Sequence, residues 1–168
     1  FWITVAATGI FLTMQSPDRY LDNTTSAFNE DGLVVMLNDR IEREKPFSVL
    51  FMAVHDFEGI KDGFTNENKK RVYSKICANL RYKGLKKKDR PKIDVFRDND
   101  NIYIMFHEAA KAEKLAMQIG SEVTDGIYLG ESAKAVKLVA KMLLFDFPGR
   151  IRTEEQFYSV IKYFLTDD

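Results

Sequence analysis

One short stretch of the chain gathers charged and amide side chains of the types that catalytic loops use. The run VFRDNDNIYIMF, Val95 to Phe106, holds one arginine, two aspartates and two asparagines in a row. Asp and Asn also adopt turn and left-handed conformations more readily than other non-glycine residues. The stretch therefore predicts a β-hairpin whose polar tip could hold a catalytic loop.

The residues after this polar run alternate in the way that a half-buried strand requires. Ile102, Ile104 and Phe106 would face one side of a sheet. Tyr103 and Met105 would face the other, with His107 following them. This period of two predicts a strand with two distinct faces, which positions the tip at its start.

Other candidate groups in the chain are isolated. The two histidines, His55 and His107, lie far apart in sequence, which is a weak indication of a metal site. Cys77 is the single cysteine, so an intrachain disulfide is excluded, and we interpret it as a small buried hydrophobic residue. A phosphate-binding loop, a paired-cysteine motif and a nucleophile elbow are all absent from the sequence.

The dense basic run KGLKKKDRPK, Lys83 to Lys92, has two interpretations. Basic runs bind phosphate-rich partners, and these lysines could lie against anionic lipid headgroups if the chain is attached to a membrane. A solvated loop is the alternative that we favour, because Asp89 and Pro91 interrupt the run and no aromatic residue is available for base stacking. We therefore expect no nucleic-acid partner.

Composition indicates one globular domain. The chain has 168 residues, of which 45% are hydrophobic, and this is enough for a sizeable core. Its 25 basic and 25 acidic side chains cancel, so no overall field attracts it to nucleic acid or to an anionic membrane.

Helical and strand periods alternate along the chain. Phe47 to Val54 is a continuous apolar run of strand length, as in a central strand covered on both faces. Thr153, followed by two glutamates and Gln156, is a capped helix start. Helices are expected over Asp31–Glu44, Asn66–Tyr82 and Glu108–Gly120, and a further strand over Ala133–Phe147. The class is α/β or α+β, with helices covering a sheet.

The N-terminal run FWITVAATGIFLTM, Phe1 to Met14, differs from the rest because it carries no charge. It is too short to span a bilayer, which takes about 20 apolar residues. We interpret it as the cytoplasmic end of a transmembrane helix from a longer protein. The alternative is a buried strand or helix that packs on the domain. Pro17 and the polar residues after it predict a short linker in both cases.

The hairpin, in its place between these elements, resembles the signature hairpin of GGDEF domains, the diguanylate cyclase family. Over the family pattern R-x-G-G-D/E-E-F, Arg97 matches the arginine and Tyr103 keeps the aromatic residue. Asn99 and Asp100 replace the two glycines, and Asn101 and Ile102 replace the two acidic residues. The resemblance implies that the side chains for metal binding and catalysis are lost here.

Two further stretches resemble the family in the expected order. VLFMAVHDFEGIKD, Val49 to Asp62, is similar to the pattern D-x-D-x-F-K-x-I-N-D, but Ala53 and His55 stand at the two aspartates and Lys61 at the asparagine that reads guanine. Thr65 and Asn66 replace a Gly-His pair, and Lys69 and Lys70 replace the Gly-Asp pair that completes the guanine pocket. DNTTSAFNEDG, Asp22 to Gly32, keeps Asp22, Thr25 and Asn29 of the pattern D-x-L-T-G-L-x-N-R.

The family also has a product-binding inhibitory site, R-x-x-D, before the hairpin. Arg90 stands at its arginine, but Ile93 holds the acidic position and Asp94 lies one residue late. A shift of one residue on a strand turns the side chain to the other face. The match is thus broken unless the loop before the strand slips by one residue. If a nucleotide binds, Arg90, Asp94 and Arg97 are the candidate contacts for GTP or cyclic di-GMP.

The resemblance implies a central five-stranded mixed sheet flanked by helices, with a β-hairpin at the former active site. We expect residues 1–16 to be the end of a transmembrane or signalling helix, 17–30 a linker leading into the domain, and 31–168 a degenerate GGDEF domain. We expect no catalytic residue, no metal ligand and no cofactor. The expected role is a cytoplasmic interaction, dimerisation or relay module of a membrane-anchored cyclic di-GMP signalling protein, with a homodimer or a neighbouring signalling domain as partner. The alternative is a receptor that binds GTP or cyclic di-GMP without turnover.

Overall fold

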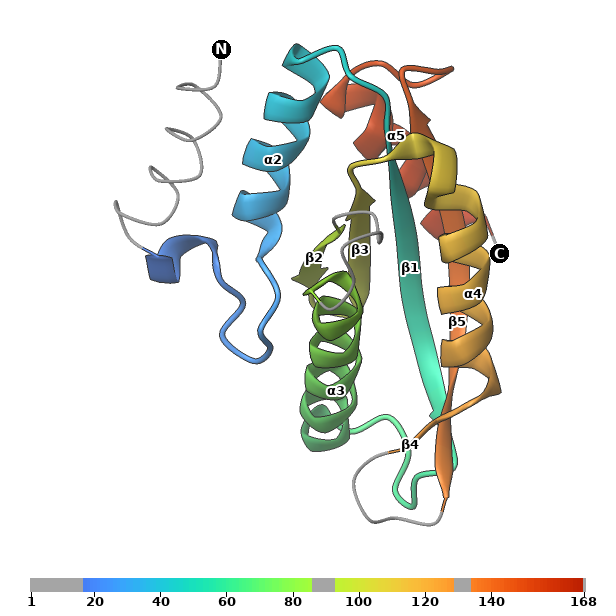
Figure 1. Cartoon of the computed structure of the whole chain (residues 1–168). Helices are drawn as coiled ribbons and strands as arrows, with labels where there is room; N and C mark the ends of the chain where they lie inside the picture. The colour runs from blue at the N-terminus through green and yellow to red at the C-terminus, as the bar shows by residue number, and fades with distance from the viewer. Residues whose placement is uncertain (1–16, 86–92, 129–133, 168) are drawn as a thin grey trace.

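The structure, a computed structural model, describes residues 17–85, 93–128 and 134–167 (Figure 1). A 3-10 helix, η1 (Pro17–Tyr20), opens this part of the chain. The elements that follow are α2 (Glu30–Glu42), β1 (Phe47–Glu58), α3 (Asn66–Leu85), β2 (Ile93–Asp98), β3 (Asn101–Phe106), α4 (Ala109–Asp125), β4 (Ile127–Tyr128), β5 (Ala135–Phe147) and α5 (Glu154–Thr166). The predicted order of helices and strands is confirmed.

The strands form one five-stranded sheet in the order β2-β3-β1-β5-β4, which confirms the expected strand number. The named strands pair antiparallel throughout, where the sequence analysis expects a mixed sheet. The physical reason is that β1 and β2 point the same way but β3 lies between them. Within the described residues, the parallel pairing that is present is the isolated bridge between Phe28 and Phe96.

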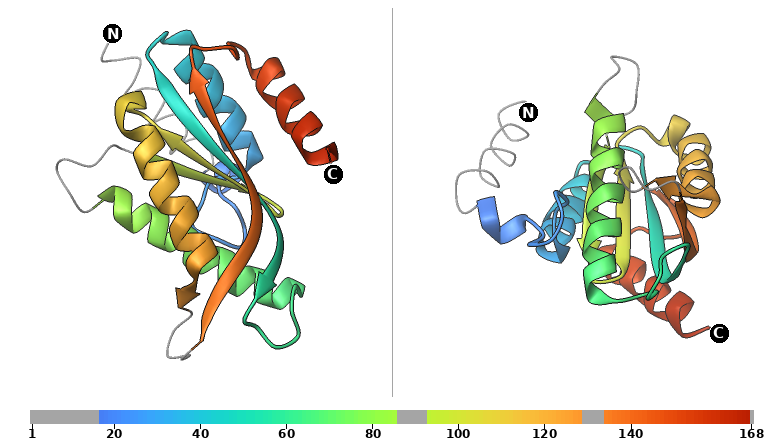
Figure 2. Two further views of the ribbon diagram at one scale, coloured as in Figure 1. Left: turned by 90° about the vertical axis from the view of Figure 1, so that its right-hand side faces the viewer. Right: turned by 90° about the horizontal axis from the view of Figure 1, so that it is seen from below.

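Helices cover both faces of the sheet, and β1 is buried on both sides as predicted (Figures 1 and 2). Leu50, Met52 and Val54 of β1 face a core that α3 and α4 cover. Val49, Phe51 and Ala53 face a second core, which α2 and α5 cover. Cys77 of α3 is fully buried in the first core, which confirms its interpretation as a small hydrophobic residue.

Side-chain caps begin three of the described helices. At the start of α3 the Thr65 hydroxyl accepts a hydrogen bond from the Asn68 backbone N–H. The Asn29 carboxamide oxygen accepts a hydrogen bond from the Gly32 backbone N–H at the start of α2. The Thr153 hydroxyl accepts one from Gln156, whose side chain in turn accepts from the backbone of Arg152. These bonds satisfy N–H groups that a helix start leaves unpaired, and they confirm the capped start predicted at Thr153.

The hairpin forms as predicted, with Asn99 and Asp100 at its turn and Asp98 opposite Asn101. Asn99 has a φ of 50°, in the left-handed region that asparagine tolerates. The two faces of β3 separate as expected: Ile102, Ile104 and Phe106 lie in the first core. Tyr103 and Met105 lie in the second core.

Residues just before α2 pack on the domain. Phe28 donates its backbone N–H to the carbonyl oxygen of Val95 at 2.9 Å and accepts one from Arg97 at 2.8 Å, beside the outer edge of β2. The Phe28 and Phe96 rings lie 5.4 Å apart. No helix within the described residues has the length and apolar character needed to cross a membrane. The run from Phe1 to Met14 and the basic residues Lys86 to Lys92 lie outside the described residues.

Candidate functional site

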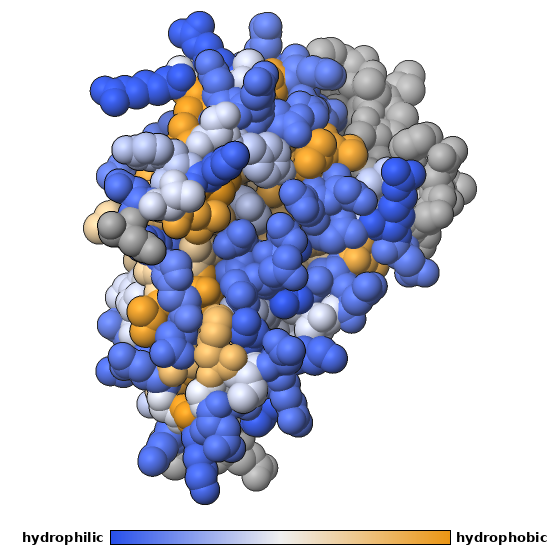
Figure 3. Space-filling model, turned by 180° about the vertical axis from the view of Figure 1, so that it is seen from behind, coloured by the Kyte–Doolittle hydropathy of each residue, from blue (hydrophilic) through white to orange (hydrophobic). Residues whose placement is uncertain are grey.

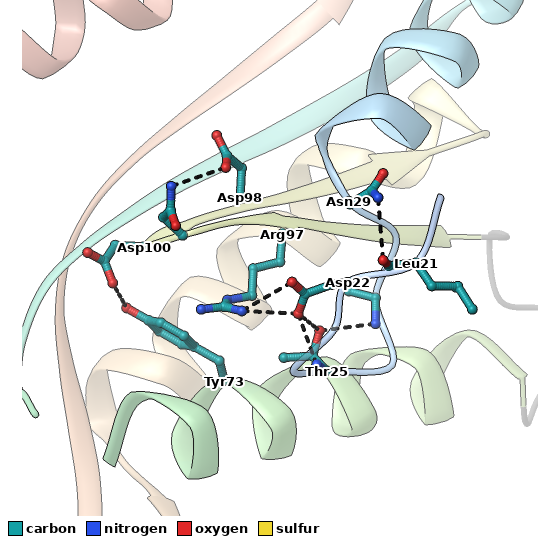
Figure 4. Close-up of polar contacts among 10 residues, drawn as sticks. Leu21, Asp22, Thr25, Asn29, Tyr73, Arg97, Asp98 and Asp100 are labelled. Carbon is teal, nitrogen blue, oxygen red and sulfur yellow. Dashed lines mark hydrogen bonds and ion pairs between the residues drawn. The ribbon is translucent and has the colours of Figure 1, made fainter. Parts of the chain in front are cut away.

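The tip of the hairpin is bound to α3 through one carboxylate. Asp100 accepts a hydrogen bond from the Tyr73 hydroxyl at 2.9 Å (Figure 4). The Lys69 ammonium lies 3.1 Å and 3.2 Å from its two oxygens. The backbone oxygen of Asp100 also accepts a hydrogen bond from Val54 of β1 at 3.0 Å. The charge of Asp100 is thus balanced by a side chain of the same protein.

Aromatic rings pack beside this contact, between the tip and the turn after β1. The Phe57 ring lies 4.9 Å from Phe64 and 5.7 Å from Tyr73, measured between centroids. The Lys69 ammonium sits 3.9 Å from the centroid of Phe64, at cation–π distance. Burial, and then the hydrogen bond to Asp100, raise the pKa of the Tyr73 phenol well above its ordinary value. Tyr73 therefore stays a neutral hydrogen-bond donor at any physiological pH.

Arg97 forms an ion pair with a carboxylate of the same protein, and its guanidinium group lies over the Tyr73 ring. Its Nη1 lies 3.0 Å and 3.2 Å from the two carboxylate oxygens of Asp22, and its guanidinium carbon lies 4.9 Å from the Tyr73 ring centroid. Asp22 also accepts hydrogen bonds from the backbone and the hydroxyl of Thr25. Asn29, which caps α2, donates its side-chain N–H to the carbonyl oxygens of Arg19 and Leu21. The residues kept from two separate motifs, Asp22, Thr25 and Arg97, therefore form one connected network (Figure 4).

The predicted nucleotide contact Asp94 is placed away from this network. Its carboxylate pairs with the Nε2 atom of His107, and Arg40 donates to the backbone oxygen of His107 at 3.2 Å. Burial, together with the neighbouring charge of Arg43, lowers the pKa of Arg40. Arg90 lies outside the described residues. The structure thus brings Asp94 and Arg97 into contacts with protein groups, Asp94 with His107 and Arg97 with Asp22, and does not bring them together.

The positions where the resemblance implies metal ligands do not fit a magnesium ion. Ala53 is 2% exposed and pairs with Asn101 across the β1–β3 ladder. His55 is exposed at the irregularity between Val54 and Asp56. Asp56 accepts a hydrogen bond from the backbone of Phe57. In the described part of the chain no three His, Cys, Asp or Glu side chains gather to hold a metal. A methyl group and an imidazole have no oxygen atom, and the amide of Asn101 offers one uncharged oxygen in place of a carboxylate, so these three side chains are a poor ligand set for magnesium.

A polar cavity of about 410 Å³ lies beside the turn that joins β1 to α3. Gly59 and Gly63 have positive φ values of 98° and 61° in this turn. Asn68 of α3 donates to the Gly63 carbonyl oxygen at 3.0 Å and holds the turn against the helix. The cavity is lined by Gly59, Ile60, Lys61, Asp62, Glu67, Asn68, Arg71, Lys134 and Val136.

Three contacts of the site were missed by the sequence analysis. Lys69 and Tyr73 lie four residues apart, so both occupy one face of a helix, and this spacing could have indicated a joint contact. The register that pairs Asp94 with Met105 puts His107 on the same face as Asp94, as a diagonal neighbour. Nothing in the sequence indicated that Glu30 would lie near Asp98. α2 brings Glu30 close to the hairpin, where burial and then the charge of Asp98 raise the pKa of the Glu30 carboxyl group.

No protein-family model matches the sequence, and no curated protein matches it either. Solved structures do. A sensory box/GGDEF family protein from Caulobacter crescentus superposes with a TM-score of 0.62 at 13% identity, over 86% of this chain and 94% of that one. The chain has the GGDEF-domain fold. The GGDEF domain of FimX from Pseudomonas aeruginosa gives a TM-score of 0.59 at 9% identity, over 83% of this chain and 87% of that one.

A third solved structure with the GGDEF-domain fold was determined with a ligand. The coiled coil and GGDEF domain of DgcB from Caulobacter crescentus, in complex with c-di-GMP, matches with a TM-score of 0.52 at 15% identity. The match covers 85% of this chain and 78% of that one. Likeness at this level of identity concerns the fold. What the GGDEF-like hairpin can do here follows from its own groups: a neutral phenol, a paired carboxylate and a paired arginine hold the tip in place.

Proposed function

We propose that this chain is a non-catalytic GGDEF-like domain of cyclic di-GMP signalling that acts as an interaction, dimerisation or relay module. The observation that carries the proposal is the state of the hairpin tip. Asp100 is bound by Lys69 and Tyr73, and the position that the resemblance assigns to a metal ligand is the buried Ala53. Phosphoryl transfer depends on metal ions to stabilise the developing charge, and within the described ranges no three His, Cys, Asp or Glu side chains gather to hold one.

Product analysis tests the loss of catalysis. The purified domain is incubated with GTP and magnesium or manganese, and the mixture is analysed for cyclic di-GMP. We expect no product above a heat-killed control, while an active diguanylate cyclase under the same conditions gives product. Clear formation of cyclic di-GMP by this chain would overturn the proposal.

A relay role is supported by the network between the N-terminal side of the domain and the tip. Asp22 contacts Arg97, Arg97 lies on Tyr73, and Tyr73 bonds Asp100. The uncharged run from Phe1 to Met14 supports attachment to the cell membrane. We infer that the domain faces the cytoplasm and responds to a signal from that segment. Fractionation of cells that express the chain tests the attachment: recovery of all the protein in the supernatant contradicts it.

A nucleotide receptor without turnover is the second candidate, and the polar cavity beside the β1–α3 turn favours it. Lys61 and Arg71 line this cavity and could bind phosphate oxygens. Calorimetric titration with GTP and with cyclic di-GMP separates the two roles, because binding tighter than about 10 µM indicates a receptor. Such binding should weaken in Arg71→Ala, with Arg150→Ala as the control at an exposed site away from the cavity.

A further inference from the structure

Helix α4 carries its charges against its own dipole. A helix favours acidic residues in its first turn and basic residues in its last, because the N-terminus is partially positive. α2 follows the rule, with Glu30 and Asp31 in its first turn and Arg40 in its last. α4 has no acidic residue in its first turn and no basic residue in its last.

Within α4 the exposed charges are reversed along the length of the helix, although its N-cap residue, Glu108, is acidic and lies 3.6 Å from the Lys111 ammonium. Glu122 and Asp125 accept hydrogen bonds from Gln118 and Ser121 of the same helix, so a partner would compete with these local contacts. Lys111 and Lys114 lie in its N-terminal half, and Glu122 and Asp125 lie among its last four residues, all of them exposed. Glu113, also in the first half, faces the groove beside β5. Basic residues near the N-terminus and acidic residues near the C-terminus are unfavourable within one helix. They become favourable when a second copy of the helix packs antiparallel, because the basic end of each copy then lies beside the acidic end of the other.

An apolar groove of about 480 Å³ runs beside this charged stripe, between α4 and β5. Gly120, Ser121 and Thr124 form its helix wall, and Ala140, Met142 and Leu144 form its strand wall. Its strand wall lies on the part of β5 that follows the short pairing with β4, which involves Ala135 and Val136. α4 runs alongside β5 here (Figure 2, left). The opposite face of the molecule is mostly hydrophilic, with apolar surface in a broken strip (Figure 3).

Met117 stands at the rim of this groove with 72% of its surface exposed. An exposed apolar side chain next to an apolar groove is the pattern of a self-complementary surface, because a two-fold axis places the side chain of each copy over the groove of the other.

We propose that the surface formed by α4 and the outer part of β5 is the interface through which a second copy of this chain binds. This deepens the proposed function by naming the surface through which the module pairs, and it rests on that function. The two copies of α4 lie antiparallel about an axis next to Gln118. Lys114 and Glu122 are each four residues from Gln118, and Lys111 and Asp125 are each seven residues from it. Each lysine of one copy therefore lies beside an acidic residue of the other.

Sedimentation velocity and light scattering over a range of protein concentrations test the interface. We expect a dimer with a dissociation constant of about 100 µM or tighter, as for other small interfaces. Met117→Glu should weaken it by at least about tenfold, because it puts a charge into the apolar groove. Tyr163→Glu is the matched control: Tyr163 is 70% exposed on α5, away from the groove, and its substitution should leave the dimer unchanged.

Charge reversal makes the test independent of any effect on folding. Lys114→Glu and Glu122→Lys should each weaken the dimer, and the double variant should restore it, because the two-fold axis pairs these positions. Added salt should weaken the wild-type dimer by screening. A dimer that none of these changes affects, or a wild type that stays monomeric at about 1 mM, overturns the interface. Product analysis with GTP gives a separate readout, so a failed interface is distinguishable from a failed proposal of non-catalytic function.

Discussion

The Tyr73 hydroxyl donates to the Asp100 carboxylate at 2.9 Å, and the same ring lies against the Arg97 guanidinium, 4.9 Å away. One buried phenol thus joins the hairpin tip to the arginine that binds Asp22. Since α3 supplies Tyr73, the hairpin, the helix and the segment before α2 share a single polar network.

Removing the Tyr73 hydroxyl should cost stability without changing the fold. Tyr73→Phe is expected to lower the free energy of unfolding by about 1 kcal/mol, because a buried hydrogen bond to a carboxylate is lost. Asp100→Ala should cost about 1–3 kcal/mol, because Tyr73 and Lys69 both lose their acceptor. Urea unfolding followed by circular dichroism measures both. Tyr163→Phe, at an exposed site, should change stability by less than about 0.5 kcal/mol, and an equal loss there would contradict the assignment.

A double-mutant cycle should show that Asp22 and Arg97 are coupled. Their side chains are only 15% and 12% exposed, so removal of one charge leaves the other poorly solvated. We expect Asp22→Asn and Arg97→Gln each to be destabilising, and the double variant to cost less than their sum by about 1–2 kcal/mol. Strict additivity in chemical denaturation would mean that the ion pair contributes nothing in solution.

Gly59 should tolerate a side chain far less than Gly63. A Cβ atom on Gly59 would lie 2.5 Å from the backbone oxygen of Ala135, at a φ of 98°, whereas one on Gly63 meets nothing within 4 Å. Gly63→Ala therefore carries only the cost of the left-handed conformation, about 1–2 kcal/mol. Gly59→Ala adds a steric clash, and we expect it to lose more than about 2 kcal/mol. Comparable melting temperatures for the two variants would argue against this geometry of the turn.

Glu30 should make stability fall as pH rises. Burial, and then the charge of Asp98, raise its pKa above the usual 4.5. Between the two pKa values the folded state binds more protons than the unfolded chain, so the contribution of Glu30 is present at low pH and is lost as pH rises through its folded pKa. Glu30→Gln should therefore gain stability relative to wild type as pH increases from 4.5. Urea midpoints of Glu30→Gln and of the wild type across this pH range give the comparison, and a constant difference between the two proteins would contradict the prediction.

Much of the fold could be predicted because burial leaves a period in the sequence. The apolar run from Phe47 and the alternation after Asn101 report which faces are covered, and both were confirmed. The two-residue strand β4 was missed because Ile127 and Tyr128 are too few to show a period. The antiparallel pairing was also missed, because an alternation of helices and strands does not say which strands become neighbours.

The site was less predictable, because its contacts join residues that are distant in sequence. The turn residues follow from residue types alone, and so does the fact that the side chain of Ala53 carries no oxygen atom. The bond between Tyr73 and Asp100 depends on how α3 crosses the sheet, and this is decided by packing. The same holds for Asp94 and His107, whose contact required the exact register of the hairpin.

Phe28 bears on how force enters this domain. Its backbone N–H and C=O bond to Val95 and Arg97 on the outer edge of β2, so the chain ahead of α2 is attached directly to the sheet. Tyr20 and Leu21 are bonded in turn to Asn29 and Phe28. A pull from the N-terminal side would thus pass through η1 and this closed loop, and then reach the strand that leads into the hairpin turn.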